Sequence, residues 1–166
     1  MATKHHNLSY YNEKDIPNGA DFKIGIVVSE WNSEITLNLL KGAKETLLQR
    51  GVLESNIYIH FVPGTFELAL GAQFLFESKV IDGIIAIGVV IQGETKHFDF
   101  VCHGATQGIM NVGLKYNKHI SFCVLTDLNI QQSIDRSGGK LGNKGVECAI
   151  ASLKMIQLQK NLSKHS

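Results

Sequence analysis

The feature that most constrains the fold is a regular alternation of continuous apolar runs with longer segments of helical periodicity. Apolar runs rich in Val and Ile cover residues 22–29, 57–62, 83–91 and 121–126, and helical patterns cover 33–51, 66–76, 97–116, 130–136 and 143–159. Parallel strands need a crossover connection, usually a helix, so this order predicts βαβ units. Strands that are apolar throughout are typical of a sheet covered on both faces. The sequence therefore predicts a single α/β domain, a three-layer sandwich with a four-stranded parallel sheet flanked by helices on both faces.

Local chemistry adds detail to these elements. Ser33 is placed to cap the helix after the first strand, and Gly51 suits its end. The segment 66–76 is apolar almost all round, which predicts a helix buried on more than one side. Residues 1–20 have weak patterning, and we expect either a disordered arm or a strand that pairs with a neighbouring subunit. Residues 21–160 then form the domain, and residues 161–166 a short tail.

Charge and cysteine content exclude several classes of protein. Lys and Arg number 16 and Asp and Glu 15, for a net charge of +1, so no global field attracts nucleic acid or a membrane surface. The three cysteines match no zinc pattern and lie in apolar stretches, which favours buried free thiols and no metal site. Because no apolar run has membrane-spanning length and no signal-peptide pattern is present, we expect a cytoplasmic protein.

The residues that follow each strand are the candidates for a site, because open parallel sheets bind ligands at the carboxyl ends of their strands. The first strand is followed by Trp31, the only tryptophan, which is suited to stacking on a planar ring or to packing. The second is followed by Pro63-Gly64 and a helix start, whose free N–H groups can bind a ligand. Glu67, in that first turn, either accepts from ligand hydroxyls or stabilises the helix N-terminus.

The third strand is followed by the most suggestive stretch, QGETKHF at residues 92–98. Gly93 lets backbone amides approach a ligand at the start of a helix, which suits a phosphate or another anion, and Thr95 adds a hydroxyl. His97 is the best-placed proton-transfer residue, because imidazole titrates near neutrality. A lone histidine is more often a surface or capping residue, and Glu94 suits an anion site only if its side chain points away.

After the fourth strand, Arg136 offers phosphate a planar fork and Lys144 a point charge, on either side of a glycine-rich loop. This loop fits neither GxxxxGK[ST] nor GxGxxG, so nucleotide binding by those two routes is unsupported. From the residues alone, we predict an α/β domain with a phosphate-bearing ligand, one histidine for proton transfer and no metal.

Taken together, these segments resemble the 6,7-dimethyl-8-ribityllumazine synthase family in both order and spacing. The matching pieces are KIGIVV followed by Trp31-Asn32, VPGTFE at 62–67, GVVIQGETKHFDFV at 88–101, FCVLT at 122–126 and IDRSGGKLGNKGVECA at 134–149. The resemblance covers residues 22–158 and implies a flavodoxin-like fold. It also implies the condensation of 5-amino-6-(D-ribitylamino)uracil with 3,4-dihydroxy-2-butanone 4-phosphate, the penultimate step of riboflavin biosynthesis, with no cofactor.

The resemblance implies a role for each matching residue. His97 would move protons. Phosphate would be bound by Gly93, Glu94, Thr95 and, from the adjacent subunit, Arg136. The ribitylaminouracil would contact the remaining set, which is Trp31, Asn32, Thr65, Phe66, Glu67, Val89, Val90 and Ile91 from one subunit, with Phe122 and Lys144 from the next.

Because such a site needs two subunits, the resemblance implies at least a pentamer. The compact loop Gly138–Gly145 favours twelve pentamers in a 60-subunit icosahedral shell, and an association with riboflavin synthase is left open. One departure from the family pattern is Gln92, which stands where many members carry Arg. It removes a positive charge near the mouth of the site.

Two other functions remain as alternatives. A flavin- or riboflavin-binding module of flavodoxin-like architecture explains Trp31 and the anion site, but it gives no role to His97, or to Arg136 and Lys144 together. A catalytically silent shell protein is the other, and it is disfavoured because the carried-over polar groups are present apart from the one that Gln92 replaces.

Overall fold

Four parallel strands form the central sheet in the computed structural model, which describes residue 7 and residues 9–163. They are β1 (Ile24–Ser29), β2 (Ile57–Val62), β3 (Gly83–Ile91) and β4 (His119–Asp127), in the spatial order β2-β1-β3-β4. All three neighbouring pairs are parallel. The predicted four-stranded parallel sheet is therefore confirmed.

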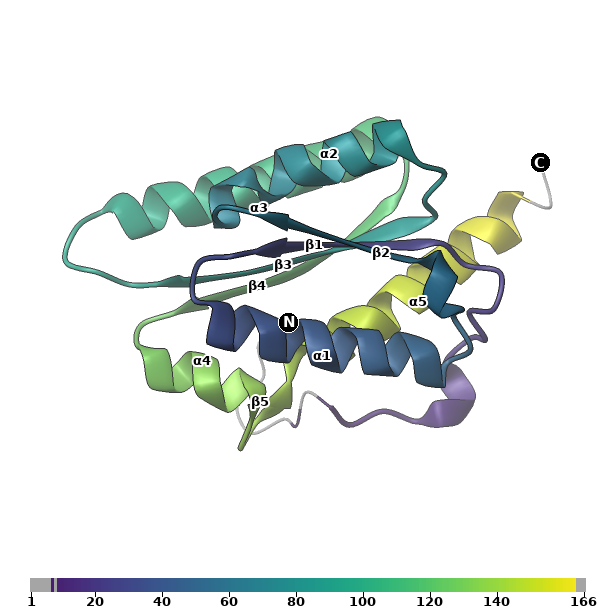
Figure 1. Ribbon diagram of the computed structural model, residues 1–166, viewed down its shortest axis with the longest axis horizontal. Coiled ribbons are helices and arrows are strands. Elements are labelled where there is room, and N and C mark those ends of the chain that lie inside the picture. Colours follow the sequence, from purple (N-terminus) through teal and green to yellow (C-terminus); the bar gives the residue numbers. More distant parts are fainter. Residues whose placement is uncertain (1–6, 8, 164–166) are drawn as a thin grey trace.

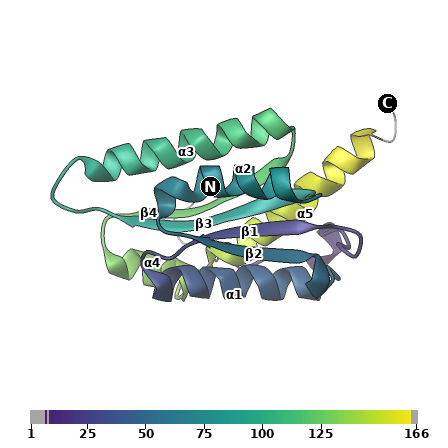
Figure 2. The same cartoon turned by 45° about the horizontal axis from the view of Figure 1, so that its top comes forward.

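Helices cover both faces of this sheet, as the apolar strands require (Figures 1 and 2). On one side lie α1 (Ser33–Gln49), the short α4 (Ile130–Arg136) and α5 (Lys144–Ser163), and on the other α2 (Leu68–Ser78) and α3 (His97–Tyr116). Successive residues of β1 face opposite layers, so that Ile26 and Val28 pack with α1 and α5 while Val27 packs with α2. The three-layer flavodoxin-like sandwich is confirmed.

The boundaries of several elements differ by a few residues from the predicted ones. The first strand begins at Ile24, and Phe22 enters the core ahead of it, because Ile24 is the first residue to pair with both neighbouring strands. The fourth strand runs longer, from His119 to Asp127, because it pairs with every residue of β3. The last helix begins at Lys144 and continues to Ser163.

The start of α1 also differs from the prediction. The capping position is occupied by Asn32 and not by Ser33, and Asn32 adopts a left-handed conformation with φ 57° and ψ 50°. Asn is among the few residues other than Gly that visit this region. The predicted end is confirmed, since Gly51 has a φ of 86° just after the helix.

The segment 66–76 folds as a 3-10 turn, η3 (Thr65–Glu67), followed by α2. Leu68, Ala72 and Leu75 of α2 are buried on the sheet. Phe66, Leu70 and Phe74 remain 60%, 52% and 58% exposed, in a stripe spaced by four residues. The predicted burial on more than one side is therefore not reached within a single chain, because no segment among the described residues covers this stripe.

The described part of the leader lies against this chain's own α1 and α5 layer (Figure 1). It contains the 3-10 turn η1 (Glu13–Asp15), and the guanidinium of Arg50 lies 3.1 Å from the carboxylate of Glu13 and over the ring of Tyr11. The side chain of Ile16 is buried in the core. The remaining leader residues, 1–6 and 8, lie outside the described part, and the pairing of the leader with a neighbour stays a prediction.

Candidate active site

A pocket of about 710 Å³ opens at the carboxyl ends of β1 and β3. Its size is within the range of small-molecule sites. In this strand order the chain leaves β1 for β2 and returns to β3 on the other side of β1, which opens a crevice beside the strand ends. The pocket is lined by Trp31, Asn32, Gly64, Thr65, Phe66, Glu67, Val89, Val90, Ile91, Gly93, Thr95, His97, Phe98, Phe100 and Val101.

The turn after β1 presents an aromatic side chain to this pocket. Trp31 is 72% exposed although it is the largest apolar side chain in the chain. It is followed by Asn32, whose left-handed backbone reverses the chain into α1 and whose carbonyl accepts from the N–H groups of Ile35 and Thr36. The indole is therefore available to stack on a planar ring, as the sequence predicts.

In the turn after β2, one hydroxyl is buried and bonded within the protein, whereas the next two side chains are exposed. Thr65 is 5% exposed, and its hydroxyl donates to the carbonyl of Val89 across a distance of 3.2 Å. This bond ties the start of η3 to β3. Phe66 and Glu67 are exposed beside it and line the pocket. Of the three predicted contacts to a ribityl chain, Phe66 and Glu67 present side chains, while the hydroxyl hydrogen of Thr65 is engaged within the protein.

The end of β3 contributes backbone to the pocket. The pairing of β3 with β1 ends at Ile87, whereas its pairing with β4 continues to Ile91. The last residues of β3 therefore have backbone groups that lie outside the β1–β3 ladder and border the pocket. Val89, Val90 and Ile91 are at this overhang, which suits the predicted contact of their backbone with the edge of a uracil.

The loop between β3 and α3 places a hydroxyl and an imidazole together. The hydroxyl oxygen of Thr95 accepts from the backbone N–H of His97 at 3.3 Å, so its hydrogen remains free to donate. A side chain at Gly93 would meet nothing within 4 Å, which leaves its backbone open to a ligand. Glu94 is exposed and does not line the pocket. This position removes the difficulty that a carboxylate poses for an anion site.

Four pocket residues were not among the predicted site residues. Gly64 belongs to the turn after β2, and Phe98, Phe100 and Val101 form the first turns of α3. Their signal in the sequence is the apolar and aromatic spacing that directly follows His97. This wall of the pocket is apolar, which favours binding of a planar ring next to the imidazole of His97.

Arg136, Lys144 and Phe122, predicted to come from an adjacent subunit, do not line the pocket of their own chain. Arg136 ends α4, and its Nη1 donates to the carbonyl of Gln132 at 2.9 Å. Phe122 borders a separate groove of about 780 Å³ between α3 and α5. The single chain therefore assembles one part of the predicted site and carries the other part elsewhere on its surface.

Lys144 forms a close ion pair with Glu147, with 2.6 Å between the ammonium nitrogen and the carboxylate oxygen. Both side chains are largely buried. Burial lowers the pKa of Lys144, but the hydrogen bond to Glu147 and the nearby side chains of Cys148, Glu147 and Cys123 raise it by more. Lys144 is therefore held as a cation at the start of α5.

Gln92, the departure from the family pattern, has an exposed side chain directly after β3. Its backbone N–H donates to the carbonyl of Asp127 at 2.9 Å, which continues the β3–β4 ladder beyond Ile91. Gln92 itself does not line the pocket. This hydrogen bond involves only the backbone, so it does not depend on the charge of the side chain at position 92.

Among residues 9–163, no three His, Cys, Asp or Glu side chains gather closely enough to hold a metal ion. The cysteines are free, with Cys123 and Cys148 buried and Cys102 half-buried. Within the same residues, no helix is both long and apolar enough to cross a membrane.

Comparison with known proteins adds evidence that is independent of the geometry. A family model described as 6,7-dimethyl-8-ribityllumazine synthase matches residues 21–160. The 6,7-dimethyl-8-ribityllumazine synthase of Christiangramia forsetii is 54% identical over 162 residues, which cover 97% of this chain and 96% of that protein. Proteins with the same name from Flavobacterium johnsoniae and Phocaeicola vulgatus are 53% and 46% identical, over 98% and 99% of this chain and 86% and 98% of their own lengths. The similarity thus extends far beyond single motifs.

Proposed function

The chain belongs to the 6,7-dimethyl-8-ribityllumazine synthase family, and from this premise we propose that the pocket beside β1 and β3 is where its reaction takes place. The protein is an enzyme of riboflavin biosynthesis. It condenses 5-amino-6-(D-ribitylamino)uracil with 3,4-dihydroxy-2-butanone 4-phosphate and releases phosphate and water. A flavin-binding module and a silent shell protein are not favoured.

One observation carries the assignment of the site to this pocket. Residues from three turns that are far apart in the sequence, represented by Trp31, Glu67 and His97, line a single cavity. The aromatic side chain suits the pyrimidine ring, the carboxylate suits the hydroxyls of the ribityl chain, and the loop at Gly93 and Thr95 suits the phosphate. Each part of the two substrates thus has a matching group.

The reaction needs proton transfers more than it needs a strong nucleophile from the protein. The 5-amino group of the pyrimidine attacks the ketone and water leaves to give an imine, after which phosphate is eliminated. Loss of phosphate leaves an enol at the carbon that carried the 3-hydroxyl, and this enol tautomerises to a ketone. The ribityl-bearing nitrogen then closes the ring on this new carbonyl, and a second water leaves. His97 would accept and return protons in these steps, while the pocket holds amine and ketone in contact.

The test of this function is direct. The purified protein is mixed with both substrates, and the absorbance and fluorescence of the lumazine are followed beside a control without enzyme. We expect formation well above the uncatalysed rate and saturation in both substrates. A rate equal to the control from a folded, oligomeric sample would contradict the proposed site and make Gln92 the first position to examine.

We also propose that the site is completed by a second subunit. The exposed stripe of Phe66, Leu70 and Phe74 lies on η3 and α2, while a different apolar groove runs between α3 and α5 along the free edge of β4. The groove is lined in part by Met110, Leu114, Met155, Leu158 and Leu162. Two unlike surfaces that pair between copies generate a ring, and Phe122 already borders this groove. Such a contact would bring Phe122, Arg136 and Lys144 of one copy towards the pocket of the next.

The ring is proposed to have five subunits, and twelve rings to form a 60-subunit shell. The shell is supported by the short hairpin of β5 (Ser137–Gly139) and β6 (Gly142–Asn143), which carries no insertion between α4 and α5. Cytoplasmic residence is proposed on the three free thiols, which suit a reducing compartment. An association with riboflavin synthase is proposed as well, and co-purification of the two activities would test it.

A further inference from the structure

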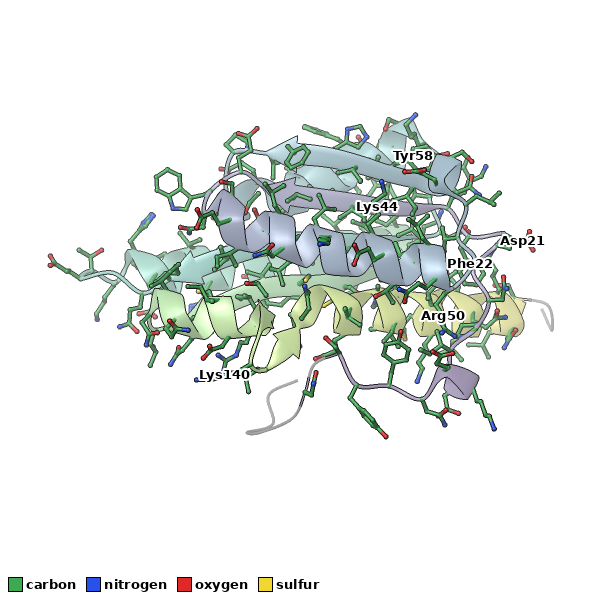
Figure 3. All side chains as sticks on the ribbon, turned by 60° about the horizontal axis from the view of Figure 1, so that its bottom comes forward. Asp21, Phe22, Lys44, Arg50, Tyr58 and Lys140 are labelled. Carbon is green, nitrogen blue, oxygen red and sulfur yellow. The ribbon has the colours of Figure 1, made fainter. Side chains whose placement is uncertain are left out.

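Asp135 lies directly before Arg136, yet its carboxylate is engaged by two other residues. One oxygen, Oδ2, is 2.9 Å from the ammonium nitrogen of Lys140, and the other, Oδ1, accepts from the side-chain amide of Gln131 at 2.9 Å. The side chain of Asp135 is 11% exposed and that of Lys140 is 72% exposed. Figure 3 shows Lys140 on the hairpin that follows α4.

The backbone of this hairpin is fixed against α4, so that Lys140 returns to Asp135. The N–H of Leu141 donates to the carbonyl of Asp135 at 2.9 Å. At Gly139 the two segments touch, because an added Cβ would lie 2.6 Å from the carbonyl oxygen of Ile134 and 2.8 Å from the Cα of Asp135. The backbone contacts of the hairpin therefore place Lys140 beside Asp135.

Arg136, by contrast, keeps most of its donors. Within the described residues, its only side-chain hydrogen bond runs from Nη1 to the carbonyl of Gln132, and none of the ion pairs among them involves it. The pKa of Asp135 is held below its usual value by the hydrogen bonds of Lys140 and Gln131, with smaller help from the charges of Lys140 and Arg136 against the effect of burial. Asp135 is thus an anion at neutral pH, and its field reaches Arg136.

We propose that Lys140 is a positioning residue for phosphate capture, which neutralises Asp135 so that the guanidinium of Arg136 stays available to the phosphate of the butanone substrate. This inference rests on the proposed role of Arg136 at the phosphate. Without the ammonium group, the carboxylate of Asp135, which interacts electrostatically with Arg136, competes with the substrate for the donors of Arg136. Lys140 itself needs no contact with the phosphate.

The test compares three variants with the wild type, namely Lys140→Met, Asp135→Asn and the double variant. For each, the Michaelis constants of both substrates, kcat and the inhibition constant of inorganic phosphate are measured. We expect Lys140→Met to raise the Michaelis constant of the butanone phosphate and the inhibition constant of phosphate by about three- to tenfold, the scale of one partly screened charge. The kcat and the Michaelis constant of the pyrimidine should not change.

The double variant decides the proposal. Removing Asp135 together with Lys140 should return both constants to within about twofold of the wild type, and Asp135→Asn alone should not raise them. Lys23→Met serves as a charge-matched control, because Lys23 is exposed just before β1, at the opposite end of the sheet. It should leave all constants unchanged.

Other outcomes overturn the proposal in distinguishable ways. If Lys140→Met and the double variant are equally impaired, Lys140 binds the phosphate itself. If all three variants are impaired and less stable to urea, the ion pair is only a clamp on the hairpin. An Arg136→Ala variant with an unchanged Michaelis constant for the butanone phosphate would remove the proposed function of Arg136 and, with it, this role of Lys140.

Discussion

The side chains around the pocket fall into two groups, those that face a ligand and those that hold the backbone. Trp31, Glu67 and His97 are exposed at the pocket, whereas the buried hydroxyl of Thr65 is bonded to the carbonyl of Val89. The reaction gains mainly from holding two substrates in contact, so the second group matters as much as the first. A residue's effect on turnover should therefore follow from which group it belongs to.

His97→Ala should lower kcat by ~10- to 100-fold, at or below the low end of the usual range for general acid–base groups. The loss is limited because positioning remains when the imidazole is gone. Steady-state kinetics on the purified variant measure it, with His103→Ala as the control, since His103 is exposed on the same helix and does not line the pocket. Complete loss of activity in a folded His97→Ala protein would contradict this account.

His119 should make the protein less stable in mild acid. Burial lowers the pKa of His119, whose Nε2 lies 2.8 Å from the hydroxyl of Ser121 beneath α5. The unfolded chain then binds a proton at this histidine more readily than the folded chain does. The free energy of unfolding is therefore unaffected by His119 above about pH 6.5, and it falls as the pH decreases from there towards the lowered pKa.

Urea unfolding at a fixed protein concentration, between pH 7.5 and 5.5, measures this effect. We expect the drop in stability to be smaller in His119→Gln than in the wild type. His60→Gln, which removes an exposed histidine on the edge strand β2, should leave the drop as it is. An equal drop in all three proteins would rule out His119 as the source.

Among the elements, the crossing of α1 and α5 fixes the start of α5, where Lys144 lies. Asn143 accepts from the N–H of Gly145 at 2.8 Å and donates to the carbonyl of Asn38 in α1 at 2.9 Å, so it caps one helix and binds the other. The two helices approach so closely at Gly145 that an added Cβ would lie 2.0 Å from the carbonyl oxygen of Leu39.

Gly145→Ala should therefore destabilise the fold by about 1–3 kcal/mol or more, because the obstructing atom belongs to the backbone and cannot rotate away. Thermal and urea unfolding measure this loss. Gly93→Ala is the matched control for stability, since its Cβ would meet nothing within 4 Å. Similar unfolding midpoints for the two variants would show that α1 and α5 separate more easily than the structure indicates.

For the whole molecule, the important property is that the chain carries two unlike apolar surfaces, while Arg136, Lys144 and Phe122 lie outside the pocket of their own chain. The stripe on η3 and α2 and the groove between α3 and α5 share no residue. A ring that joins them would bury both and supply Arg136 to a neighbour's His97. Catalysis and assembly would then depend on the same contact.

Co-expression of His97→Ala and Arg136→Ala chains tests the shared site. In random mixed rings, about a quarter of the sites combine an intact His97 with an intact Arg136 from the neighbour. At a low concentration of the butanone phosphate, the mixed sample should be more active than either variant alone. Activity equal to the mean of two separately purified variants, with mass measurements showing mixed rings, would mean that each chain builds its own complete site.

The sequence by itself determined the elements and the chemistry of the turns, because both depend on neighbouring residues. Apolar runs and helical periodicity located the strands and helices, and the segments after β1, β2 and β3 contained Trp31, Glu67 and His97 in readable motifs. The family resemblance added to the predicted site residues such as Phe122, whose neighbours in the sequence form no recognisable binding motif. The sequence pattern did not reveal Asn32 as the cap of α1, since Ser33 offers an equally good capping side chain.

Only the tertiary structure decided how these pieces meet. The order β2-β1-β3-β4 brings the turns after β1 and β3 to one crevice, and the register leaves the end of β3 beyond β1. The bond from Thr65 to Val89, the ion pair of Lys140 with Asp135 and the exposed stripe on α2 depend in the same way on segments folded against one another. Local patterns determine what a segment becomes, whereas strand order, register and exposed faces result from packing between distant segments, which no single stretch of sequence contains.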